Sequence, residues 1–194
     1  MAEETLKADF DEEGIEPEKE MTFLEHLEEL RWRIIYSLIG IVVGTIVAWI
    51  FIDFLVEVIL LKPARDSGAV LQNLRPFGQL FLFMQIAIMV GMIISIPNLF
   101  YQFWQFISPA LRKKEKRYIF WIVAFSSICF LGGIAFAYFA MLPLTMQFAA
   151  QFGSESIKNE FAIDEYMSII ISVMLAAGFV FELPMISFFL SKLG

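Results

Sequence analysis

Carboxylates gather immediately before the first long apolar run of the chain. Glu25, Glu28 and Glu29 stand just ahead of two arginines, Arg31 and Arg33. Three acids that two arginines balance only in part can attract a cationic ligand. The simpler alternative is that Glu29 pairs with Arg33, or Glu28 with Arg31, as helical neighbours, and such exposed pairs contribute only about 0–1 kcal/mol. The residue types alone leave both interpretations open.

Glu182 is an acid inside another apolar run. Sixteen uncharged residues precede it and nine follow it. A charge at the centre of a membrane costs at least about 2.5–3.5 kcal/mol, so the carboxyl must be protonated, paired with another helix or open to water. We expect a polar cavity in the cytoplasmic half, with Gln85, Gln102 and Gln105 as candidate companions. The alternative is a neutral acid that holds helices together by hydrogen bonding.

Covalent chemistry has little support in the sequence. His26 is the only histidine and Cys129 the only cysteine, so neither an intrachain disulfide nor a Cys/His metal site is predicted. No serine elbow and no phosphate-binding glycine loop is present in the sequence. We predict that the chain is not an enzyme and needs no cofactor or metal, and that His26 is a packing or hydrogen-bonding residue.

Four long apolar stretches must position these acids. The chain has 194 residues, 59% of them hydrophobic, and its mean hydropathy is +0.71. We predict an all-α, polytopic membrane protein, because each stretch is long enough for a helix to cross about 30 Å of hydrocarbon. The predicted parts are an acidic mobile tail at 1–20, a cytoplasmic amphipathic helix at 21–33, and a transmembrane bundle at 34–194 with spans at about 34–56, 78–106, 118–147 and 166–191.

The sequence predicts where the amphipathic helix begins and which of its sides is apolar. A capping box formed by Thr22 and Glu25 predicts where it begins. Apolar residues then recur at helical spacing and predict one greasy side, with the acids and arginines on the opposite side. That greasy side consists of Phe23, Leu27, Leu30 and Ile34.

Charge predicts the orientation. Residues 112–117 hold five bases, whereas the connection between spans three and four holds four acids and one lysine. The basic connection is therefore expected in the cytoplasm, which places both ends of this chain there too. Residues 1–29 carry a net charge of −10 and the remainder +3, so the acidic balance belongs to the tail. Neither the charge nor the aromatic spacing indicates a nucleic-acid surface.

Glu115 is the one acid among the five bases of residues 112–117. Charge pattern alone favours its pairing with a neighbouring base. The predicted topology nevertheless places it on the same side of the membrane as Glu29. Two carboxylate sites on one surface match a ligand with two guanidinium groups, because arginine makes bidentate contacts with carboxylates that lysine cannot reproduce.

Several small, proline and tryptophan residues indicate packing rather than chemistry. Small residues on spans one, three and four permit close helix contacts. Prolines within spans are expected to interrupt the hydrogen-bond ladder and kink the helix, and tryptophans to lie at the membrane boundaries. These residues are Gly40, Gly44, Gly132, Gly133 and 176–178; Pro97, Pro143 and Pro184; and Trp49, Trp104 and Trp121.

Four motifs in order resemble the TatC family, the signal-peptide receptor subunit of the twin-arginine (Sec-independent) protein translocase. The likeness covers about residues 21–194. The motifs are HLEELR at 26–31, YQFWQFISPAL at 101–111 with KEKR at 114–117, FAYF at 136–139 with LPL at 142–144, and FELP at 181–184.

The resemblance implies a receptor in the bacterial cytoplasmic membrane for twin-arginine signal peptides. Its partners would be TatA- and TatB-type single-span subunits, further copies of itself and the lipid bilayer, and the proton-motive force would drive export of folded proteins. By motif position, Glu29 and Glu115 would contact the arginine pair, and Arg31 and Phe106 would support that surface. Glu182 would be the acid within the membrane. The structural prolines would be Pro63, Pro97 and Pro184.

Family members have six spans, and this chain is expected to hold the first four. It is therefore expected to be a fragment or truncated form. The alternative function is part of a proton-coupled secondary transporter with Glu182 as proton carrier. Against this, only one acid lies within the spans and the two halves show no evident repeat. An intramembrane enzyme ranks last, because candidate nucleophiles are lacking.

Overall fold

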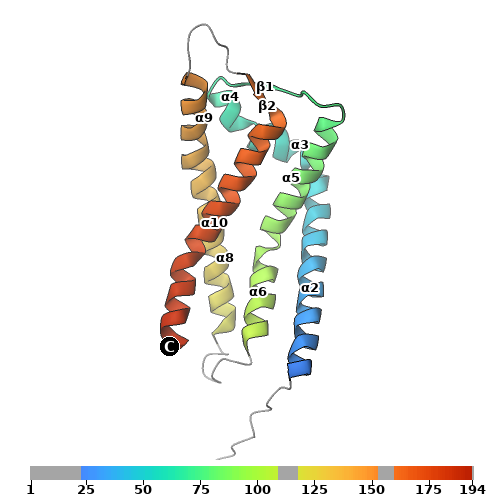
Figure 1. The fold of residues 1–194 in the computed structure, drawn as a ribbon, viewed down its shortest axis with the longest axis vertical. Helices are drawn as coiled ribbons and strands as arrows, with labels where there is room; N and C mark the ends of the chain where they lie inside the picture. The colour runs from blue at the N-terminus through green and yellow to red at the C-terminus, as the bar shows by residue number, and fades with distance from the viewer. Residues whose placement is uncertain (1–22, 109–117, 153–159, 194) are drawn as a thin grey trace, which may run out of the picture.

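The computed structural model describes residues 23–108, 118–152 and 160–193. It is an elongated, mostly helical bundle (Figure 1). Three helical segments, 24–50, 119–151 and 163–188, are long and apolar enough to cross a membrane, and a bent pair of helices makes a fourth if it is counted as one span. The main helices are α2 (Phe23–Ile50), α5 (Gly78–Ile94), α6 (Ile96–Ile107), α8 (Ile119–Phe136), α9 (Leu142–Gln151) and α10 (Ile163–Leu193). Thr22 of the predicted capping box and the predicted acidic tail lie outside the described residues.

The bent pair is α5 and α6, which meet at Ser95 with an angle of 53°. Pro97 stands in the first turn of α6, where its missing N–H and its ring break the ladder, so the predicted kink is confirmed. The Ser95 hydroxyl donates to the carbonyl oxygen of Gly40 at 2.6 Å and so joins the break to α2. Pro184 lies inside α10, which continues to Leu193, and the kink predicted there stays a prediction.

Pro143 and Pro63 stand where helices begin. Pro143 stands in the first turn of α9, directly after the π-helical turn η3 (Ala137–Met141), and Pro63 is buried in the first turn of α4 (Lys62–Asp66). First-turn positions suit proline, because the N–H groups there lack an intrahelical acceptor. Trp104 is buried against Ile119 at the start of α8, and its position at a membrane boundary stays a prediction.

Small residues hold the helices in close contact. On α2, a Cβ built at Gly44 would lie 2.5 Å from the carbonyl oxygen of Gly91 on α5. On α8, a Cβ at Gly133 would lie 2.6 Å from the carbonyl oxygen of Ala177 on α10. The predicted close contacts are therefore confirmed on both helix pairs, whereas Gly132 faces open space. Because lipid tails are as apolar as core side chains, such packing is a main source of helix association in membranes.

One end of the bundle carries short elements that the sequence did not indicate (Figure 1). After α2 the chain forms α3 (Ile52–Phe54), the π-helical segment η1 (Leu55–Leu60) and α4. Strand β1 (Val70–Gln72) then pairs in parallel with β2 (Glu160–Ala162). The all-α prediction is wrong at this pair, because three-residue strands are too short to give an alternating pattern. Arg75 pairs with Asp164 at 3.1 Å and ties the same two chain segments together.

Two tyrosines connect η1 to the helices beside it. The Tyr166 hydroxyl on α10 donates to the carbonyl oxygen of Leu60 at 2.7 Å, and the Tyr138 hydroxyl donates to that of Ile59 at 2.9 Å. The bond from Tyr166 is buried. Carbonyl oxygens at the end of a helical segment tend to lack intrahelical donors, so the Tyr166 hydroxyl satisfies a Leu60 acceptor whose burial alone would be costly.

Removal of the buried hydroxyl is expected to lower stability. Tyr166→Phe leaves the Leu60 carbonyl oxygen without its donor, and the expected loss is about 1–3 kcal/mol in the free energy of unfolding. Thermal unfolding in detergent micelles measures it. Tyr101→Phe on the exposed side of α6 is the control and is expected to lie within about 0.5 kcal/mol of wild type. Equal melting temperatures for the two variants would contradict the role given to the Tyr166 hydroxyl.

Candidate functional site

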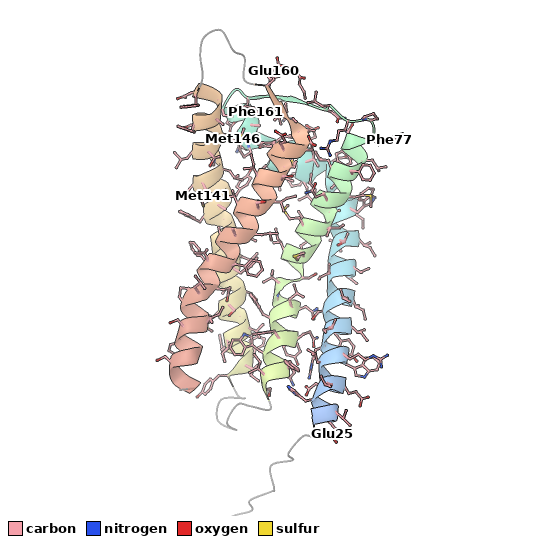
Figure 2. The ribbon with its side chains drawn as sticks, viewed as in Figure 1. Glu25, Phe77, Met141, Met146, Glu160 and Phe161 are labelled. Carbon is pink, nitrogen blue, oxygen red and sulfur yellow. The ribbon has the colours of Figure 1, made fainter. Side chains whose placement is uncertain are left out.

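The site forms at the end of the bundle where α2 begins, α6 ends and α8 begins (Figure 1). Glu25 marks this end in Figure 2, and Phe77 and Glu160 mark the opposite one. The imidazole of His26 stacks on the ring of Phe106, with centroids 4.4 Å apart and planes inclined by 17°. His26 is thus a packing residue, and this contact joins the start of α2 to the end of α6.

A polar network runs between α2 and α6 one turn deeper. Arg33 Nη2 pairs with Glu29 Oε1 at 3.0 Å, and Arg33 Nη1 donates to Gln102 Oε1 at 3.1 Å. Gln102 Nε2 donates to Asn98 Oδ1 at 3.4 Å, and Asn98 Nδ2 donates to the carbonyl oxygen of Tyr36 at 3.2 Å. The network therefore leaves α2 at Arg33, passes through two amides of α6 and returns to the backbone of α2.

The Glu29 carboxylate is only partly satisfied. Its side chain is 21% exposed, and Oε1 accepts from Arg33. The second oxygen, Oε2, is buried and has no hydrogen-bond partner among the residues that the structure describes. A buried acceptor without a donor costs about 1–3 kcal/mol, and more when it is charged. Such an atom is a place where a cationic ligand gains binding energy.

The side of α2 that faces α6 is the polar one, a choice that the sequence left open. Leu27 and Ile34, from the expected greasy side, are 44% and 51% exposed, whereas Glu29 and Arg33 lie inward. Hydrocarbon accepts apolar side chains, so in a membrane bundle the outer face can be greasy while polar side chains meet between helices. The greasy side of α2 is therefore its outer side.

The remaining predicted residues divide between this site and its surroundings. Phe106 reaches the site through the His26 stack, and the Glu29–Arg33 pair, predicted as an alternative, is present. Arg31 and Glu28 are exposed and form no ion pair with each other within the described segments. Glu115 lies outside the described residues. The helices that flank its connection, α6 and α8, end and begin at this same end of the bundle (Figure 1).

Glu182 lies on α10 with 5% of its surface exposed. Its carboxyl lies near the Ser126 side chain and the backbone of Phe130 on α8, while Oε1 has no hydrogen-bond partner among the described residues. Of the companions expected on span two, Gln102 is wrong, because it belongs to the Arg33 network, and the neighbours shown for Glu182 come from α8. The low exposure shows that the carboxyl is buried among the described residues, and the expected polar cavity in the cytoplasmic half stays a prediction.

Sequence reasoning missed two residues, Asn98 and Ser126. Both stand in apolar helices where a polar side chain needs a partner, and that was the available signal. Their partners, Gln102 and Glu182, come from the same helix and from a different one, respectively. Such pairings follow from which helix faces meet, and spacing along the chain does not fix that.

Comparison with known proteins gives consistent matches. The family described as Sec-independent protein translocase protein (TatC) matches residues 25–194. The chain is 35% identical over 179 residues to the protein of that name from Desulforapulum autotrophicum, covering 91% of this chain and 66% of the relative. The Aquifex aeolicus protein is 36% identical, with coverages of 90% and 74%. The crystal structure of twin arginine translocase receptor TatC in DDM superposes with a TM-score of 0.80 at 37% identity, covering 88% of this chain and 77% of that one.

Proposed function

Because the chain belongs to the TatC family of Sec-independent protein translocase proteins, we propose that it binds twin-arginine signal peptides at the end of the bundle that carries Glu29. It is a multi-pass membrane protein and a translocase component rather than an enzyme. The chain spans 66% and 74% of the length of the Desulforapulum and Aquifex relatives, so the activity of the whole translocase enters as part of the proposal.

One observation carries the proposal: Glu29 presents a buried carboxylate oxygen without a partner among the described residues. A guanidinium group supplies both the charge and the N–H donors that this oxygen lacks. Glu115 is proposed as the second acid, since the helices on either side of its connection reach the same end of the bundle. The exposed Arg31 and the stacked Phe106 are proposed to border the bound peptide.

The proposed arrangement in the membrane has four spans, with α5 and α6 together forming the second. Both ends of the chain would lie in the cytoplasm, with residues 1–20 as a tail and 21–33 as the cytoplasmic start of α2. TatA- and TatB-type subunits, and further copies of this chain, are proposed to assemble with it in the bacterial inner membrane, where the proton-motive force drives export. Glu182 is proposed as the intramembrane acid of this assembly. Family membership leaves the transporter alternative without support.

Peptide binding to the chain in lipid nanodiscs tests the proposal. We expect a twin-arginine signal peptide to bind at least about tenfold more tightly than its twin-lysine version, because lysine cannot form the guanidinium fork. Glu29→Gln is expected to weaken binding about 10- to 100-fold, because it removes the charge that pairs with the peptide.

Glu28→Gln is the matched control, since Glu28 is an exposed neighbour on the same helix. This variant is expected to bind within about twofold of wild type, as exposed charges contribute little. Equal affinity for the two peptides, or unchanged binding in Glu29→Gln, would overturn the proposed function.

A further inference from the structure

We infer that Gln102 is a positioning residue of the peptide site: it holds Arg33 so that Arg33 occupies one oxygen of Glu29 and leaves the other free for the ligand. The inference rests on the proposed function, since it assigns the chemistry of the same site. Its basis is the direction of each hydrogen bond between α2 and α6.

The Tyr36 carbonyl oxygen, at the end of this chain of hydrogen bonds, fixes which groups donate and which accept. The Tyr36 carbonyl oxygen can only accept, so the Asn98 amide must turn its NH₂ group toward it. Asn98 Oδ1 then faces Gln102, which must donate through Nε2. Gln102 Oε1 is consequently the atom that faces α2, where it accepts from Arg33 Nη1. A backbone carbonyl thus sets the orientation of two amides and, through them, of a guanidinium group.

Arg33 is held at two of its nitrogens. Nη1 bonds to Gln102 and Nη2 pairs with Glu29 Oε1, so the two terminal nitrogens of the guanidinium group bond to different partners, an amide and a carboxylate. A guanidinium that faced only Glu29 would form the favoured bidentate pair and take both oxygens. The contact with Gln102 therefore prevents Arg33 from occupying both oxygens of Glu29. The outcome is seen at Oε2 of Glu29, which is buried but has no partner among the described residues.

This geometry predicts the effect of removing the amide while keeping both charges. In Gln102→Leu, Arg33 is released to pair with both oxygens of Glu29, and the twin-arginine peptide must displace it. We expect the peptide to bind about tenfold more weakly, the loss typical for one charge-assisted hydrogen bond. Arg33→Lys is the second variant, because an ammonium group has a single nitrogen and cannot bond to Gln102 and Glu29 in the way that the two guanidinium nitrogens do. We expect a loss of peptide affinity of similar size.

A double-variant comparison separates positioning from a general structural effect. Gln102→Leu is measured in the wild-type chain and in Glu29→Gln, with the full chain in nanodiscs and the same twin-arginine peptide. If Gln102 acts through Glu29, the roughly tenfold loss is expected in the wild-type background and within about twofold of no effect in Glu29→Gln. Gln105→Leu, half-buried on the same helix, is the matched control and is expected to bind like wild type in both backgrounds.

The outcomes distinguish this inference from the proposed function. Wild-type chain that binds twin-arginine and twin-lysine peptides equally well would overturn the proposed function itself. Glu29-dependent binding that is unchanged in both Gln102→Leu and Arg33→Lys would overturn only the positioning role. An equal loss in both backgrounds, together with a lower melting temperature, would show that Gln102 supports the fold and would also overturn the positioning role.

Discussion

Gly91→Val is expected to lower the free energy of unfolding by about 3 kcal/mol or more, near or above the upper end of the usual cost of overpacking. Gly91 is buried where α5 crosses α2, and a Cβ at this position would lie 2.6 Å from the Cα of Thr45. The atoms that it meets belong largely to backbone, which cannot rotate away as a flexible side chain can. The two helices must therefore separate, and the contacts along their length weaken together.

Gly132→Val on α8 is the control for Gly91→Val. Both variants place a β-branched residue within a helix, so their intrinsic helix costs are alike. A Cβ at Gly132 meets nothing within 4 Å, so no overpacking is expected there. Thermal unfolding in detergent micelles, followed by circular dichroism, measures both. Equal melting temperatures for Gly91→Val and Gly132→Val would contradict the close contact between α2 and α5.

Glu182→Leu is expected to raise the free energy of unfolding by about 2 kcal/mol. The carboxyl is buried on α10, and Oε1 lacks a partner among the described residues, so its burial is compensated only in part. Leucine has a similar volume and favours the membrane interior, where a charged residue costs about 2.5–3.5 kcal/mol. The Ser126 hydroxyl that loses Glu182 can bond to a carbonyl oxygen one turn earlier in α8.

Glu182→Gln is the companion variant, because it removes the charge and keeps an acceptor for Ser126. Its stability is expected to lie between those of wild type and Glu182→Leu. Denaturant unfolding in mixed micelles compares the three proteins. A Glu182→Leu chain that is less stable than wild type would mean that the carboxyl holds α10 and α8 together. The expected gain instead means that the acid is kept at a cost in stability, as residues with a functional role often are.

Part of the fold was predictable from local sequence. Runs of 18 or more apolar residues indicate membrane spans because backbone groups in hydrocarbon must bond within their own helix. The break before α6 followed from Pro97, which removes a donor and clashes with the preceding turn. Close helix contacts followed from Gly44 and Gly133, since small residues allow backbones to approach. Each of these effects acts through a residue and its own helix.

Local sequence determined less of the ends of the bundle. The pairing of β1 with β2 joins segments about ninety residues apart, and neither is long enough to show a period. The unbroken course of α10 through Pro184 likewise follows from its surroundings, because neighbouring helices can compensate the missing hydrogen bond in a membrane protein.

For the site, the sequence by itself determined which residues carry charge and that Glu29 and Arg33 are helical neighbours. Only the tertiary structure decided that this polar face of α2 turns inward against α6. An apolar helix face is stable against lipid, whereas its exposure to water would be unfavourable. The same packing decided that Gln102 bonds to Arg33 rather than to Glu182, whose neighbours come from α8. Which helix faces meet depends on helices that are distant in sequence. For this physical reason the sequence identified the acids, whereas their partners could be found only from the tertiary structure.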